Sequence, residues 1–289
     1  MLNEPLLSAI NEHFGLTLLI NKVKPIGGGD SNQCFQVADS ANTRYFIKLN
    51  HNPEPLEAEV RNLNLLRNAP VTTPKFLGFS VINNLGVLLL EHLVLTDNGD
   101  EASLGHQLAE LHKVVNDRYG LAYNNFIGHT PQRNDWHNGW AGFWWQCRLA
   151  PQFAQAESLG YRLGIDATQL QALSDGLLQG HKPAASLLHG DLWGGNKGYL
   201  ADATPVLFDP ASYYGDRETD LAFTLVFGGF GDNFYHSYQR AWPLPPGWQK
   251  RESLYNLYHF LNHLNLFGSA YLGSVKSVIK SLRDSSTGS

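Results

Sequence analysis

Apolar and polar positions alternate differently in the two parts of this chain. In the first part, residues 3–13 and 54–68 carry apolar side chains at helical spacing, and Pro53 and Pro55 stand at the start of the second helix. Short apolar runs bounded by turn residues predict strands. The expected strands cover residues 17–26, 33–38, 44–49, 76–80 and 86–90. This pattern predicts a small sheet with one internal helix.

From Ser103 onward the pattern is mostly helical. Residues 104–112 have one apolar face, and a tryptophan-rich segment follows at residues 135–157. Further helices are expected over residues 167–179, 219–228, 249–267 and 274–283. We therefore expect an α+β chain with two lobes: a sheet lobe over residues 1–92 and a larger helical lobe over residues 93–289.

Composition narrows the choice of partners. The formal net charge is −5 and no basic stripe is visible, which argues against a nucleic acid. The two cysteines, Cys34 and Cys147, lack metal-site spacing. No apolar run reaches the length of a membrane span, and the first residues do not read as a signal peptide. These features predict a cytoplasmic protein that binds no membrane; they do not specify an oligomeric state.

The strongest chemical signal is the stretch from His189 to Asn196, which reads HGDLWGGN. An Asp and an Asn five residues apart, followed by Asp209 at the end of an apolar run, have the spacing of a kinase catalytic loop and its metal-binding strand. Asp191 would accept the proton of the acceptor hydroxyl. Asn196 and Asp209 offer the oxygen ligands that magnesium prefers. Gly190, where protein kinases have Arg, favours a kinase of small molecules.

The sheet lobe offers candidates for the nucleotide side. A glycine-rich turn can bring backbone N–H groups close to phosphates, although an ordinary hairpin turn is the alternative. Lys48 stands inside an apolar strand and needs a partner, for which Glu59 is preferred over Glu57. The alternative is an edge-strand lysine that reaches water. The predicted ATP contacts are Gly28, Gly29, Asp30, Ser31, Asn32, Lys48, Glu59, Glu91 and Leu93.

Three further residues of the helical lobe stand out. Trp193 lies between Asp191 and Asn196, where a flat ring could pack on a sugar or an amine, and a core tryptophan is the alternative. His189 is expected to support the loop rather than react. Asp220, at the start of an apolar helix, is expected to cap or brace the loop backbone.

These strings together resemble the fructosamine kinase (ketosamine 3-kinase) family, a relative of the aminoglycoside and choline kinases. The stretch HGDLWGGN matches the catalytic loop of that family letter for letter. Three other segments are similar to family segments: residues 125–136, residues 213–221 and residues 255–268. The resemblance spans nearly the whole chain.

The resemblance implies a bilobal protein kinase-like fold and phosphorylation that depends on ATP and magnesium. The substrates would be ketosamines, the ribulosamine, erythrulosamine or fructosamine adducts of amines or protein lysines. Phosphorylation of the sugar 3-hydroxyl gives an unstable product, so the role would be deglycation. Carried over by position, Asp191 is the base, Asn196 and Asp209 are metal ligands, and Lys48 and Glu59 are the phosphate-side pair. Trp193, His263 and Asp216 are the substrate-pocket candidates.

The sequence departs from the family pattern at two places. Gly29 stands where some members have a cysteine, so a redox switch in the glycine loop is doubtful. Residues 137–140 read HNGW where an acidic pair is common, which could alter the choice of amine. The alternative enzyme is another small-molecule kinase of the aminoglycoside or choline type. A pseudokinase that binds nucleotide without turnover is a further alternative. It would usually lack one of four polar residues that are all present here: Lys48, Asp191, Asn196 and Asp209.

Overall fold

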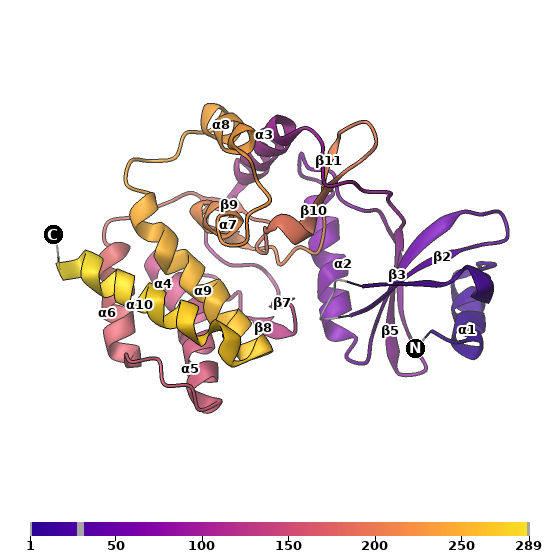
Figure 1. Cartoon of the computed structure of the whole chain (residues 1–289), viewed down its shortest axis with the longest axis horizontal. Helices are drawn as coiled ribbons and strands as arrows, with labels where there is room; N and C mark the ends of the chain where they lie inside the picture. The colour runs from indigo at the N-terminus through magenta and orange to yellow at the C-terminus, as the bar shows by residue number, and fades with distance from the viewer. Residues whose placement is uncertain (1, 28–31, 288–289) are drawn as a thin grey trace. The chain divides into compact units, whose positions relative to one another are not determined.

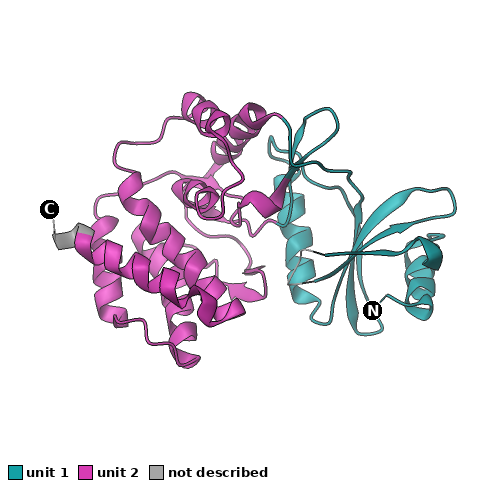
Figure 2. Cartoon of the chain, viewed as in Figure 1, with its two compact units in different colours: residues 1–99, 198–209 teal, residues 100–197, 210–289 magenta. Residues whose placement is uncertain are grey.

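The computed structural model describes residues 2–27 and 32–287, which divide into two compact units (Figure 2). Unit 1 comprises Met1–Gly99 and Gly198–Asp209; unit 2 comprises Asp100–Lys197 and Pro210–Ser289. The sequence placed a single boundary between residues 92 and 93, whereas the chain returns to unit 1 after the catalytic loop. The hairpin of β10 (Lys197–Tyr199) and β11 (Pro205–Leu207) makes this return, because its backbone bonds to Thr96 and Thr72 of unit 1. Local apolar patterns do not reveal such long-range pairing.

Unit 1 is built on a five-stranded antiparallel sheet (Figure 1). Its strand order is β1-β2-β3-β5-β4. The strands are β1 (Lys24–Ile26), β2 (Gln33–Ala38), β3 (Arg44–Asn50), β4 (Phe76–Ile82) and β5 (Leu85–Glu91). The last four confirm the strands expected from the sequence, with ends that differ by at most two residues.

The two faces of this sheet pack against different helices. Helix α1 (Glu4–Phe14) joins a core cluster that includes Ile47 and Leu49 of β3. Helix α2 (Glu54–Leu66) joins a second cluster, against which Phe46 packs. Because side chains alternate along a strand, Lys48 shares a face with Phe46 and points toward α2.

The strand expected over residues 17–26 is wrong in its first half. The structure has a short 3₁₀ turn at Ile20–Lys22, and only Lys24–Ile26 joins the sheet. The side chain of Asn11 accepts from the N–H of Leu18 at 2.8 Å and donates to its carbonyl at 2.9 Å. A side chain thus satisfies backbone groups that a strand ladder would otherwise need to satisfy.

Unit 2 is mainly helical. Its helices are α3 (Glu101–His112), α4 (Trp140–Trp144), α5 (Ala150–Ser158), α6 (Ala167–Leu177), α7 (Glu218–Thr224), α8 (Asp232–Ala241), α9 (Gln249–Phe267) and α10 (Leu272–Thr287). A π-helical turn, Trp145–Leu149, joins α4 to α5, and 3₁₀ turns lie at Gly194–Asn196 and Ser269–Tyr271. Among the described residues, no helix is long and apolar enough to cross a bilayer.

Short strands of unit 2 hold the start of the catalytic loop. A three-stranded sheet has the order β12 (Tyr214–Gly215), β9 (Ala185–Leu187) and β6 (Val115–Asn116), and β7 (Asn125–Ile127) pairs with β8 (Thr130–Gln132). Strand β9 leads directly into the loop, and its Leu187 pairs with Tyr214. The helix expected over residues 219–228 ends at Thr224, and Gly228 and Gly229 then adopt φ of 72° and 92°. Such angles suit glycine, and they redirect the chain here.

Candidate active site

A buried lysine with two carboxylates forms the polar centre of unit 1. Lys48, on β3, is 3% exposed, and its Nζ donates to Oε1 of Glu59, on α2, at 2.8 Å. Its Nζ also contacts Oδ1 of Asp209, whose side chain is 46% exposed. The predicted Lys48–Glu59 ion pair is therefore confirmed, and Glu57 pairs with Arg61 instead. The alternative of a lysine that reaches water is wrong.

The two carboxylates keep this lysine charged. Burial by itself would lower the pKa of Lys48, but the charges of Asp209 and Glu59 outweigh it and raise that pKa above its usual value. Burial raises the pKa of Glu59, and Lys48 offsets only part of this effect. Asp209 has φ of 55°, in the left-handed region that few residues other than glycine adopt. Strain of this kind concentrates at functional sites.

In unit 2, hydrogen bonds to one buried carboxylate anchor the backbone of the catalytic loop. Asp220, on α7 and 2% exposed, accepts from the N–H of His189 at 2.7 Å and from the N–H of Gly190 at 2.9 Å. It also accepts from Nε2 of His112 at 3.1 Å. Burial alone would raise the pKa of Asp220, but the bond and charge of His112 and the loop donors lower it. The expectation that Asp220 braces the loop backbone is confirmed.

The loop residues next to this anchor are fixed by close contacts. Gly190 has φ of 85°, and a Cβ there would lie 2.1 Å from the carbonyl oxygen of Ala211. No side chain fits this position, which explains the glycine where protein kinases have Arg. His189 is fully buried; its Nδ1 accepts from the N–H of Asp191 at 3.3 Å, and its carbonyl accepts from the N–H of Ala211 at 2.9 Å. These contacts confirm that His189 supports the loop.

Asn196 closes the loop around Asp191. Its Nδ2 donates to the carbonyl of Asp191 at 2.8 Å and to the carboxylate Oδ2 at 3.0 Å. These contacts orient the carboxylate and use the nitrogen of the Asn196 amide, so Oδ1 is the atom that a divalent cation would take. The carboxylate of Asp209, in unit 1, is the other oxygen donor that the sequence predicts for magnesium. The ligand roles of Asn196 and Asp209 stay predictions.

Trp193 is held at the tip of the same loop. Its indole covers Gly195, where a Cβ would lie 2.2 Å from the nearest ring atom. The ring is half-buried and meets Phe227 edge to face, with centroids 5.8 Å apart. The neighbouring Gly194 lies so close to the Gly228 backbone that a Cβ would come within 2.9 Å of its carbonyl oxygen. The segment that carries Phe227 is thus packed directly on the catalytic loop.

His263, on α9, belongs to the same aromatic group. It lies 5.2 Å from Phe227 between ring centroids, so Phe227 links the two substrate candidates Trp193 and His263. His259, one turn earlier, is buried and stacks on Phe223 at 3.5 Å. Burial lowers the pKa of His263 and lowers that of His259 to about 3. Both imidazoles are therefore neutral near pH 7.

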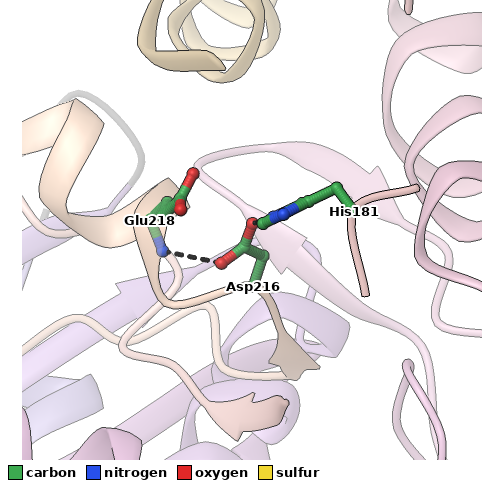
Figure 3. Close-up of side chains that lie close together, drawn as sticks. All are labelled: His181, Asp216 and Glu218. Carbon is green, nitrogen blue, oxygen red and sulfur yellow. Dashed lines mark hydrogen bonds and ion pairs between the residues drawn. The ribbon is translucent and has the colours of Figure 1, made fainter. Parts of the chain in front are cut away.

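Asp216, the third substrate candidate, lies in a cluster with His181 and Glu218 (Figure 3). It is 1% exposed, and its Oδ2 accepts from Tyr255 at 2.6 Å and lies 2.6 Å from Nε2 of His181. Its Oδ1 accepts from the N–H of Glu218, whose carboxylate binds Arg251 through two contacts of 2.7 Å. His181, Asp216 and Glu218 could approach one metal ion, but protein donors already engage both carboxylates. Asp216 thus belongs to a buried hydrogen-bond network, and its contact with the substrate stays a prediction.

The other nucleotide candidates belong to unit 1. Gly28, Gly29, Asp30 and Ser31 lie outside the described residues. Asn32 is described, and its Oδ1 accepts from Asn50 at 2.8 Å. The carboxylate of Glu91 accepts from the N–H of Lys75 at 2.8 Å, and Leu93 is half-buried. Their contacts with ATP stay predictions.

Cys34 lies beside this region. It is the cross-strand partner of Lys48 and is half-buried. Burial raises the pKa of its thiol to about 11, and Lys48 only partly opposes this. Because the thiolate is the reactive form, this environment agrees with the doubt about a redox switch.

Comparisons with known proteins identify the family of this chain. A family model described as fructosamine kinase matches residues 3–285. The "Probable ketoamine kinase" of Vibrio cholerae is 35% identical over 284 residues, which cover 96% of this chain and 98% of that protein. The "Protein-ribulosamine 3-kinase, chloroplastic" of Arabidopsis thaliana is 35% identical over 278 residues, which cover 92% of this chain and 83% of that protein.

Solved structures show the same fold. A "Putative fructosamine-3-kinase" from Haemophilus somnus superposes with a TM-score of 0.87 at 27% identity, covering 95% of each chain. A macrolide 2′-phosphotransferase from Brachybacterium faecium has a TM-score of 0.62 at 16% identity, over 95% of this chain and 98% of that one. The second likeness concerns the fold alone. The predicted α+β, protein kinase-like fold is confirmed.

Proposed function

The chain belongs to the fructosamine kinase family, and from this premise we propose that it transfers a phosphoryl group from ATP to the sugar 3-hydroxyl of a ketosamine. The observation that carries the proposal is the closed loop in which Asn196 orients the carboxylate of Asp191 while Trp193 stands between them. A loop with this base and an aromatic side chain beside it suits a sugar linked to an amine.

Each residue of the candidate site has a separate role in the proposed phosphoryl transfer. Asp191 accepts the proton of the attacking hydroxyl, and Asn196 holds its carboxylate in place for that step. Lys48, kept cationic by Glu59 and Asp209, neutralises phosphate charge. Magnesium, held by Oδ1 of Asn196 and the carboxylate of Asp209, would supply further charge neutralisation when bound. Asp220 keeps the loop backbone in position throughout.

The substrate class follows from the family. The relatives from Vibrio cholerae and Arabidopsis thaliana carry ketoamine and ribulosamine kinase names. Ribulosamines and erythrulosamines, free or on protein lysines, are the proposed acceptors, and loss of the unstable 3-phosphate would free the amine. A cytoplasmic location stays a prediction, and the plant relatives are named chloroplastic.

The test is ATP consumption with a panel of acceptors: ribuloselysine, erythruloselysine, fructoselysine, an aminoglycoside and choline. We expect turnover with one or more of the three ketosamines. Asp191→Asn should remove this turnover and leave ATP affinity largely intact, which separates loss of the base from loss of the fold. Turnover only with the aminoglycoside or choline would replace the proposal with the other small-molecule kinase.

A further inference from the structure

An aromatic track runs away from the catalytic loop across unit 2. It begins at Trp193 and passes to Phe227 at 5.8 Å and then to His263 at 5.2 Å. From His263 it reaches Phe267 at 5.5 Å and Tyr271 at 5.0 Å. We call these five residues the aromatic track.

The aromatic track is partly open to solvent, with two exposed rings and three half-buried ones. Phe227 and Phe267 are 43% and 45% exposed and are among the large apolar side chains that the described surface leaves most open. Scattered exposed apolar residues need no explanation, whereas contiguous exposed apolar patches are typical of binding surfaces. The row begins at Trp193, which follows Asp191 by two residues in the catalytic loop.

Rigid backbone fixes the first two rings of the track relative to each other. Gly194 of the loop and Gly229 of the Phe227 segment touch, since a Cβ on Gly229 would lie 3.0 Å from the Cα of Gly194. Glycines on both sides allow this approach. The backbone therefore holds Trp193 and Phe227 next to each other before any ligand binds.

The chemistry of the track suits one part of the substrate. A ketosamine has a sugar, which must reach Asp191, and an amine substituent, which must leave the loop along the protein surface. A secondary ammonium group is attracted to aromatic faces, and methylene groups pack on them. His263 does not oppose a cation, because burial lowers its pKa and keeps it neutral.

We propose that the aromatic track binds the aliphatic amine substituent of the ketosamine and that Phe227 sets the preference for its length. This inference rests on the proposed function. The substituent nitrogen lies near Trp193, and the alkyl chain crosses Phe227 toward His263. A chain of about four methylene groups, as in lysine, spans roughly one ring-to-ring step, whereas a methyl group ends before Phe227.

The experiment compares two acceptors that differ only in the amine: the ribulosamine of butylamine and the ribulosamine of methylamine. The ratio of their kcat/KM values is measured for the wild type and for Phe227→Ala. Loss of about two buried methylene contacts predicts a fall in this ratio of about tenfold, with the KM for ATP unchanged. Phe267→Ala, farther along the track, should leave the ratio of kcat/KM for the butylamine and methylamine adducts nearly unchanged. It should lower kcat/KM only for adducts with longer substituents.

Leu159→Ala is the matched control, since Leu159 is 50% exposed in the same unit and lies outside the track. Its ratio should equal that of the wild type. A Phe227→Ala variant that slows both acceptors equally would show a packing role and overturn the inference. A wild type that prefers neither acceptor would do the same. Failure of the wild type to phosphorylate either adduct would overturn the proposed function itself, and the inference with it.

Discussion

Removal of the Asp220 carboxylate should loosen the catalytic loop and destabilise unit 2. In Asp220→Ala, the N–H groups of His189 and Gly190 and the Nε2 of His112 lose their acceptor at a site that is 2% exposed. Each unsatisfied buried donor costs about 1–3 kcal/mol, and water that enters the new space recovers part of this. We expect a loss of about 3–5 kcal/mol in the free energy of unfolding, a large share of the 5–15 kcal/mol typical of a folded domain.

Catalysis should fall further than stability explains. Both loop donors lie directly before Asp191, so their release lets the base move, and a displacement of about 1 Å can cost about 100-fold in rate. Asp220→Asn keeps one acceptor oxygen and should lie between the wild type and Asp220→Ala in both measurements. The assays are urea unfolding followed by tryptophan fluorescence and kcat with a ribulosamine at a temperature where each variant is folded.

Asp232, exposed in the first turn of α8, gives the control. Asp232→Ala should change the free energy of unfolding by less than about 1 kcal/mol and leave kcat unchanged. If the free energy of unfolding of Asp220→Ala is within about 1 kcal/mol of the wild-type value and kcat is retained, contacts other than those of Asp220 hold the loop.

Lys48→Met should lower the free energy of unfolding by about 3–5 kcal/mol, because it leaves Glu59 buried without its partner. Adding Glu59→Gln should restore most of this stability but not the affinity for ATP. Restored affinity would show that Lys48 does not bind phosphate. Burial lowers the pKa of His259 to about 3, so its neutral form contributes stability above pH 6.5 that is lost as the pH falls toward 3. When the pH falls from 7 to 5, the free energy of unfolding measured in urea should thus decrease by about 2 kcal/mol less in His259→Phe than in the wild type. Equal decreases would contradict a neutral, buried His259. Gly195→Ala should displace the Trp193 ring and raise the KM for a ketosamine about tenfold while the KM for ATP stays constant; an unchanged ketosamine KM would make Trp193 a packing residue.

Local signals explain the parts that the sequence predicted correctly. The apolar spacing of residues 249–267 sets helix α9 at its observed bounds, and a lysine inside an apolar strand requires a buried partner such as Glu59. Asp220 follows the same logic, since a carboxylate at the start of an apolar helix can serve backbone donors nearby. Each of these predictions depends on residues close in sequence or on a charged side chain that needs a partner when it is buried.

Contacts that the apolar pattern does not encode explain the rest. The backbone of Leu18 bonds to the side chain of Asn11, which no strand pattern reveals. Helix α8 was not predicted, although Phe234 and Tyr238 stand four residues apart on its buried face and Gly231 precedes its first turn. Phe227 was assigned only to a helix, because its contact with the loop depends on glycines that meet across a gap of more than 30 residues.

Asp191 is proposed to act as the base in the phosphorylation of a ketosamine. The most direct measurement follows the products of ATP and ribuloselysine by phosphorus NMR, with the wild type and Asp191→Asn in parallel. We expect a new sugar phosphate at the 3-oxygen that forms with the wild type, then decays as free lysine appears, and is absent with Asp191→Asn. A phosphate on another hydroxyl, or turnover by Asp191→Asn near the wild-type rate, would contradict this proposal.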